Sequence, residues 1–253
     1  MLDYRQEAAR YDALRGGEPR AEAAAEGVLS LIPPDARGLL DVACGTGIVT
    51  RRLAAARPAM RVTGADLTPE MARHAVARLP GAVVLADSRR LPFRDGEFDA
   101  VSSVWLLHLL DGPAEVAAVV AECARVLRPG GVYVTTVDKA ASHNVGSDID
   151  AVLATRPRGP AHDASEAVAG YAADAGLVPA GRTRFAGRGQ GRSPRRAVTD
   201  LRRGWFMTLP PGDPRADGYA ERLAALPDQD RDRPEPWFAL RGFRKAGGVG
   251  GRG

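Results

Sequence analysis

Several apolar runs in the chain end in residues that could do chemistry. The run "LLDVA" leads into the turn "CGTG", where Gly45 and Gly47 let the backbone turn sharply and present N–H groups at the start of a helix. Such a turn can accept a carboxylate or a phosphate. A dinucleotide fingerprint would need a third glycine where Thr50 stands, and a phosphate loop would need Gly-Lys-Ser/Thr. Pyrophosphate is therefore not the expected ligand.

Three later apolar runs also end in polar groups. Asp66 could accept both hydroxyls of a ribose, and Asp87 could accept a hydrogen bond from the exocyclic amine of adenine. Backbone carbonyls around Ser103 and Val104 could hold a cationic amino group, which Asp41 would help neutralise. Each aspartate alone is equally consistent with a turn at the end of a strand. Together these groups fit a ligand with a carboxylate, an ammonium, a ribose and an adenine but no phosphate, which describes S-adenosyl-L-methionine.

The elements that must position these residues alternate between strand and helix. Strand-like runs lie at 37–44, 60–66, 81–87, 98–107 and 132–137, and helical patterns at 48–56, 69–79 and 113–127. This alternation predicts a parallel sheet with helices on both faces, which binds ligands at the carboxyl ends of its strands. Further along, the pattern predicts helices at 165–176, 195–209 and 217–226, and strands at 176–187 and 236–246.

Four segments, taken in order, resemble the successive motifs of the class I S-adenosylmethionine-dependent methyltransferases: "LLDVACGTG", "GADLTPEM", "LADSRRLPFRDGEFDAVSSVWLLHLL" and "RVLRPGGVYVTT". The resemblance covers roughly residues 10 to 140 and is closest to the ubiquinone/menaquinone-type and bacterial small-molecule enzymes. It implies an α/β fold with a Rossmann-like, doubly wound sheet of seven strands. Most of these strands should be parallel, and the last, near Trp237 to Arg244, should be antiparallel.

The resemblance also implies the domain boundaries. Residues 1–246 would form a single domain, with N-terminal lid helices in 1–30, the cofactor-binding core in 31–140, and the acceptor side with the C-terminal strands in 141–246. Residues 247–253 would be a disordered tail.

The family likeness assigns cofactor-binding roles to residues at the strand ends. The methionine end would be lined by Asp41, Ala43, Gly45 and Gly47, and Cys44 in the same turn would pack against the cofactor or the core. The adenosine would contact Asp66, Leu67, Met71, Asp87 and Ser88. The pocket would be closed by Ser103, Val104 and Trp105, and by Tyr11 and Arg15 from the lid.

A base for the acceptor could come from two histidines near the cleft. His108 follows the fourth strand and His143 follows the fifth, so both could act in catalysis, although each could equally brace a loop. No spacing of ligands suggests a metal.

Composition bounds the function further. The chain has 253 residues, two cysteines, a net charge of +4, and neither a signal-like N-terminus nor an apolar run long enough to cross a membrane, so we expect a cytoplasmic protein. We expect a small-molecule acceptor and a monomer or homodimer. The arginine-rich stretch 182–203 could recruit tRNA or another nucleic acid, but a solvated surface is the favoured interpretation. A non-catalytic S-adenosylmethionine-binding protein remains a second alternative, and a nicotinamide dehydrogenase a third, which Thr50 disfavours.

Overall fold

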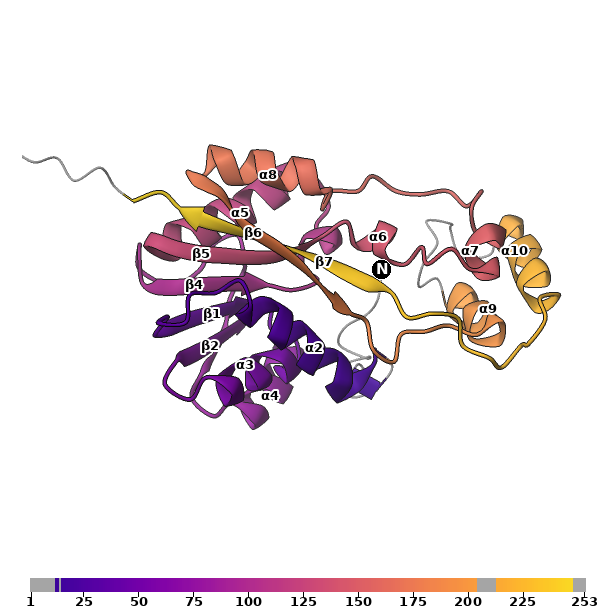
Figure 1. Cartoon of the computed structure of the whole chain (residues 1–253), viewed down its shortest axis with the longest axis horizontal. Coiled ribbons are helices and arrows are strands. Elements are labelled where there is room, and N and C mark those ends of the chain that lie inside the picture. The colour runs from indigo at the N-terminus through magenta and orange to yellow at the C-terminus, as the bar shows by residue number, and fades with distance from the viewer. Residues whose placement is uncertain (1–11, 14, 204–212, 248–253) are drawn as a thin grey trace, which may run out of the picture.

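Seven strands form one sheet in the order β3-β2-β1-β4-β5-β7-β6 (Figure 1). The computed structural model describes residues 12–13, 15–203 and 213–247. Strands β1 to β5 are parallel, and β7 runs antiparallel to both β5 and β6. The strands are β1 (Gly38–Val42), β2 (Arg61–Asp66), β3 (Val83–Leu85), β4 (Phe98–Ser103), β5 (Leu127–Val137), β6 (Leu177–Ala186) and β7 (Trp237–Lys245). The predicted fold class, the number of strands and the antiparallel last strand are confirmed.

Helices cover both faces of the sheet (Figure 1). One face carries α2 (Gly17–Leu29) and α3 (Ile48–Ala56), and the other carries α5 (Pro113–Val126) and α8 (Ser165–Asp174). The remaining helices are α4 (Pro69–Arg78), the 3-10 turn η1 (Leu107–Leu109), α6 (Lys139–Ser142), α7 (Asp148–Val152), α9 (Pro194–Arg202) and α10 (Pro214–Ala224).

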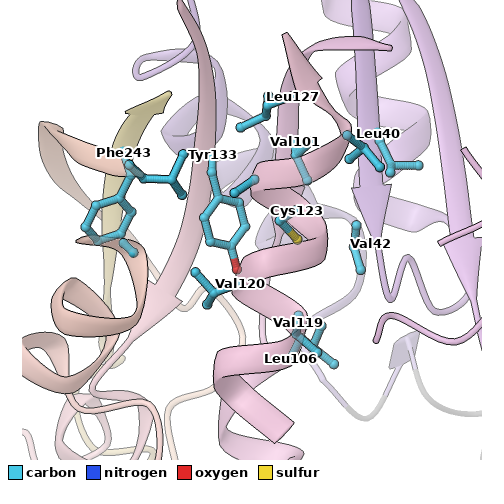
Figure 2. Close-up of a cluster of buried hydrophobic side chains, with 14 of the residues drawn as sticks. Leu40, Val42, Val101, Leu106, Val119, Val120, Cys123, Leu127, Tyr133 and Phe243 are labelled. Atoms are coloured by element: carbon cyan, nitrogen blue, oxygen red, sulfur yellow. The ribbon is translucent and has the colours of Figure 1, made fainter. Parts of the chain in front are cut away.

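Helix α5 shows why the sequence forms this core. Val116, Val119, Val120 and Cys123 recur at helical spacing, and all four are completely buried. Figure 2 shows the cluster that α5 forms with β5, where the ring of Tyr133 is also buried. This packing fixes β4 and β5, whose carboxyl ends border the site described below.

Helices α7, α9 and α10 form a separate group beyond the end of the sheet (Figure 1). They bury a small core of their own, which includes Leu153, Leu201, Tyr219 and Leu223. The group belongs to the region predicted to hold the acceptor. The end of the helix predicted at 195–209 lies outside the described residues, as does all of the tail predicted at 247–253 except Gly247.

Helix α2 corrects the prediction that residues 1–30 form a lid. Ala21, Ala24 and Val28 are fully buried in the core that α2 shares with the sheet, because small side chains let the helix pack closely. Residues 17–29 thus belong to the packed fold, a lid before Gly17 stays a prediction, and Tyr11 lies outside the described residues.

Two strand boundaries also differ from the prediction. Strand β4 ends at Ser103 rather than at 107, because Trp105 adopts a left-handed backbone conformation with φ of 60° and η1 follows. Strand β5 begins at Leu127 rather than at 132, and it includes the "RPGG" segment that was expected to be a helix stop.

The arginine-rich stretch does not form one continuous surface. Arg182 and Arg184 lie exposed on β6, whereas the Nε of Arg192 lies 3.4 Å from a buried carboxylate, that of Asp200. Arg195 makes an exposed ion pair. Most arginines of the stretch are exposed, and Arg192 and Arg196 are half-buried, so the stretch is mainly a solvated surface.

Candidate functional site

A cavity of about 340 Å³ opens at the carboxyl ends of β1, β2 and β4. Most of the predicted cofactor residues contribute to its wall. Those that line it are Asp41, Ala43, Cys44, Gly45, Asp66, Leu67, Met71, Asp87, Ser88, Val104 and Trp105. The first strand-to-helix turn, predicted from its paired glycines to approach a ligand, thus lies on the cavity.

Asp41 is the most deeply buried acid of the cavity wall. Its Oδ2 accepts a hydrogen bond of 2.6 Å from Thr50 and its Oδ1 accepts one of 2.7 Å from Ser102. Burial is the main cause that raises the pKa of Asp41 to about 6, and the two hydroxyls offset part of that rise. Thr50, where a dinucleotide fingerprint has glycine, therefore serves to hold this carboxylate.

The glycine turn works differently from the expectation. The N–H of Gly45 donates to Oδ2 of Asp66 at 2.8 Å, and the N–H of Gly47 donates to the carbonyl of Cys44 at 2.9 Å. Both amides are therefore already bonded within the site and do not point at a ligand. The role of Gly45 is spatial, because it has φ of 58° and a Cβ there would enter open space.

Gly47 is not among the residues that line the cavity, so its predicted contact with the cofactor stays a prediction. It caps α3 with φ of 75°, and a Cβ there would come within 3.0 Å of Ala75 on α4. A glycine at this position lets the two helices approach each other, which is a structural role.

Asp66 ends β2 at the cavity edge and is 7% exposed. Its Oδ1 accepts the N–H of Thr68 at 2.8 Å, as its Oδ2 accepts that of Gly45. Because each carboxylate oxygen has two acceptor positions, the group can still accept two hydroxyls from a ligand. These backbone bonds fix the orientation that such a role needs.

The carboxylate of Asp87 is already engaged by Arg89, a residue that sequence reasoning missed. Arg89 donates to it through Nε and Nη2, and also donates to Glu115 at 2.5 Å. The pKa of Asp87 is lowered, first by the hydrogen bonds of Arg89. The spacing of two residues in "DSRR" was the available signal for this pair. An adenine amine would have to share the carboxylate with Arg89.

Trp105 forms the wall where β4 ends. Its φ of 60° is rare for a bulky residue, and its backbone N–H is held by Oγ1 of Thr136 at 2.7 Å. The guanidinium of Arg20 lies 4.1 Å from the centre of the indole ring and also lines the cavity. Sequence reasoning missed Arg20; its place four residues before the buried Ala24 on α2 was a signal that it faces inward.

Four other predicted residues lie away from the cavity wall. Ser103 is fully buried, and its hydroxyl lies 2.7 Å from the Tyr133 hydroxyl, so its side chain does not reach the cavity wall. Arg15, His108 and His143 are also not part of the wall. A catalytic role for either histidine stays a prediction.

The thiol of Cys44 packs at the cavity and against the sheet. A Cβ on Gly64 of β2 would come within 2.9 Å of its Sγ, so the two residues are in close contact. Burial raises the pKa of Cys44, so this thiol is held in its unreactive, protonated form.

The N-terminal segment is tied to the glycine turn through Asp12. Oδ1 of Asp12 accepts a hydrogen bond of 2.7 Å from Thr46, which lines the cavity, and Oδ2 pairs with Arg78 at 2.7 Å. Arg78 also donates to the backbone carbonyl of Thr46. This contact places Asp12, from the segment that was predicted to be a lid, at one edge of the cavity.

The charge of the cavity wall is acidic. Five carboxylates and two guanidiniums line it, which gives a formal balance of −3: Asp41, Asp66, Asp87, Asp111 and Glu115 against Arg20 and Arg89. This balance suits a ligand with a net positive charge and opposes the pyrophosphate of a nicotinamide cofactor. Within the described part of the chain, no group of three His, Cys, Asp or Glu side chains is placed to hold a metal ion, and no helix is both long and apolar enough to cross a membrane.

The fold resembles solved structures across nearly the whole chain. The [4+2]-cyclase SpnF superposes with a TM-score of 0.62 at 21% identity, covering 97% of this chain and 94% of that one. At this identity the likeness speaks for the fold alone.

Sequence comparisons identify the central segment. Residues 40–135 match the family model of the methyltransferase domain. The ubiquinone/menaquinone biosynthesis C-methyltransferase UbiE of Desulfotalea psychrophila is 37% identical over 101 residues, which are 39% of this chain and 40% of that protein. The malonyl-[acyl-carrier protein] O-methyltransferase of Hahella chejuensis is 37% identical over 132 residues, 49% of this chain and 44% of that protein. The chain thus matches less than half the length of these two relatives. Residues 40–135 thus carry a methyltransferase domain of the class I S-adenosylmethionine-dependent type, and the strand order and the position of the cavity agree with this assignment.

Proposed function

We propose that the protein transfers the methyl group of S-adenosyl-L-methionine to a small-molecule acceptor in the cytoplasm. The observation that carries this proposal is the acidic cavity at the carboxyl ends of β1, β2 and β4. S-adenosyl-L-methionine carries an ammonium and a sulfonium against one carboxylate, so its net charge of about +1 complements such a wall.

The residues present fit the cofactor in three places. Asp66 would accept the ribose hydroxyls, and Asp41 would face the ammonium. Arg20 would pair with the cofactor carboxylate, a role that the sequence pattern assigned to the glycine amides. The open space at Gly45 leaves room for the methionine part.

The cofactor supplies an activated methyl group on a sulfonium, so the chain needs mainly to orient the acceptor. Orientation of two reactants can contribute roughly 7–11 kcal/mol in favourable cases. Trp105 at the end of β4 would form the wall between the cofactor and the acceptor, and the segment held by Asp12 would exclude water. Residues of α6 and of the segment after it would contact the acceptor, because they directly follow the carboxyl end of β5.

The acceptor is proposed as a small molecule of secondary metabolism or quinone-like biosynthesis. The two relatives are named for methylation of carbon and of oxygen, respectively, so they leave the accepting atom open.

A [4+2]-cyclase, SpnF, has a similar fold, so the fold alone does not imply methyl transfer. The test therefore measures cofactor binding and methyl transfer separately. Calorimetry with S-adenosyl-L-methionine measures binding. To measure transfer, the protein is incubated with S-adenosyl-L-methionine labelled in its methyl group, once with a metabolite extract and in parallel with tRNA. The proposal expects saturable binding and label in small molecules. Absence of binding overturns it, label in tRNA alone moves the acceptor to nucleic acid, and binding without transfer to either marks a non-catalytic binding protein.

A further inference from the structure

Basic side chains gather beside the cavity, on the far side of Trp105. Five residues, called here the basic cluster, come from four separate parts of the chain: Arg15, His108, Lys139, His143 and Arg192. His108 follows β4 and Lys139 follows β5, so the cluster lies at the same sheet edge as the cavity. In Figure 1, α6, which begins at Lys139, lies between the sheet and the group of α7, α9 and α10.

Ring contacts connect the basic cluster to the cavity wall. Nζ of Lys139 lies 3.4 Å from Nε2 of His143. The His143 ring packs edge-on against Phe238 at 5.4 Å, and Phe238 packs edge-on against Trp105 at 5.6 Å. Since Trp105 lines the cavity, these ring contacts link His143 of the cluster to the cavity wall.

The cluster holds positive charge in a poorly solvated place. Burial first, and then the charges of Arg15 and Arg192, lower the pKa of Lys139 to about 8. Burial and the charge of Lys139 lower the pKa values of His108 and His143 well below the usual range, so both imidazoles are neutral at pH 7.

Two acids face this charge from neighbouring segments. Oδ2 of Asp163 accepts the backbone N–H of Lys139 at 2.8 Å, and Oδ2 of Asp200 lies 3.4 Å from Nε of Arg192. The pKa of Lys139 stays lowered despite the charge of Asp163.

His108 adds an observation that is independent of charge. Its Nδ1 atom is shut off from solvent and has no hydrogen-bond partner among the described residues. Buried polar atoms nearly always have a partner, so an orphaned one beside a cluster of cations is a place where a ligand group would bind.

We propose that the basic cluster binds an oxyanion, a carboxylate or a phosphate, carried by the methyl acceptor. The proposal rests on the proposed function and narrows its substrate class to organic acids or phosphate esters. An oxyanion would neutralise the clustered cations, accept hydrogen bonds from guanidinium and ammonium groups, and engage the imidazoles. Its position behind Trp105 would anchor the acceptor while the reacting part reaches toward the cofactor.

The test uses three probes of similar size on the full chain: benzoate, phenyl phosphate and neutral benzamide. S-adenosylhomocysteine is first titrated and then kept saturating, so that the cofactor cavity is filled. We expect one or both anions to bind at least about ten-fold more tightly than benzamide, and the tighter anion identifies carboxylate or phosphate. Equal affinities for all three probes in the unmodified protein overturn the proposal without any variant.

Two variants locate the site. Lys139→Met and Arg192→Met are expected to weaken the anion at least about ten-fold while S-adenosylhomocysteine affinity stays unchanged, which also reports that the fold is intact. Arg195→Met removes an exposed arginine from the start of α9 and serves as the matched control, with no expected effect on either ligand. An equal loss of anion affinity in the Arg195→Met control would place the anion on the surface and refute its binding at the basic cluster. Failure of S-adenosylhomocysteine to bind the unmodified protein would instead overturn the proposed function, since anion binding is read separately.

Discussion

Replacing Asp41 by asparagine should stabilise the protein and weaken its cofactor binding at the same time. The carboxylate is 3% exposed, and its pKa is raised from 3.8 to about 6 chiefly by burial. A shift of about two units corresponds to roughly 3 kcal/mol against the charged form, at 1.36 kcal/mol for each unit. Asparagine has the same shape without the charge, and the hydroxyls of Thr50 and Ser102 can each donate or accept.

The sign of this effect follows from proton linkage. A group with a raised pKa in the folded state favours folding when it is protonated, and that contribution is lost as pH rises from about 3.8 to about 6. Asp41→Asn should therefore match the unmodified protein below pH 4 and exceed it by about 2–3 kcal/mol in free energy of unfolding above pH 6. Urea denaturation at several pH values measures the difference.

Binding should change in the opposite direction. A cation placed beside Asp41 favours its ionised form, so the affinity of the unmodified protein for S-adenosyl-L-methionine should rise as pH increases through about 6. Asp41→Asn should bind at least about ten-fold more weakly at pH 7.5, with a flatter pH profile. Asp95→Asn, which changes an exposed carboxylate, is the matched control and should alter stability by less than about 0.5 kcal/mol. A variant that is no more stable than the unmodified protein, or that keeps full affinity, would refute the assignment of Asp41.

Three further changes test other parts of the site. Asp66→Asn should lower cofactor affinity roughly ten- to a hundred-fold, because hydrogen bonds to a charged group contribute about 1.5–3 kcal/mol. Calorimetry measures the affinity, and an unchanged unfolding transition shows that the variant is folded. An affinity equal to that of the unmodified protein would refute the binding of the ribose by Asp66. Asp12→Ala should weaken the affinity for the cofactor roughly three- to ten-fold by releasing the N-terminal segment. Hydrogen exchange of that segment should then no longer slow when the cofactor is added. Slowing retained in the variant would contradict the role of Asp12 in holding the segment. Gly64→Ala should destabilise the fold by about 1–3 kcal/mol because its methyl group meets Cys44, whereas Gly218→Ala on α10, where a Cβ meets nothing within 4 Å, should stabilise it by about 0.5–1 kcal/mol. Thermal unfolding of the pair measures the contrast, and equal shifts would argue against close packing at β2.

The pattern of neighbouring residues in the sequence was enough to predict most of the strands and turns that line the cavity. Apolar runs and helical spacing are written in consecutive residues, so the strands that end at Asp66 and before Gly45 could be placed from those residues alone. Parallel strands bring their carboxyl ends to one edge, so the assembly of these residues around one cavity followed from topology.

Only the tertiary structure decided how those residues are used. The amide of Gly45 bonds to Asp66, which belongs to another strand, so its partner could not be inferred from the turn itself. The left-handed backbone of Trp105, which lines the cavity, could not be inferred from the apolar run either.

The acceptor side depended on contacts between distant segments even more strongly. Arg20 reaches the cavity because α2 packs on the sheet beside Trp105, and the basic cluster forms where Arg15, Lys139 and Arg192, far apart in the chain, lie near one another. Local sequence encodes the propensity of each segment, whereas charge gathered from separate segments exists only after folding. The sequence by itself therefore determined the fold class and the cofactor motifs, and the tertiary structure decided the electrostatic character of the site, because burial and proximity are properties of the packed chain.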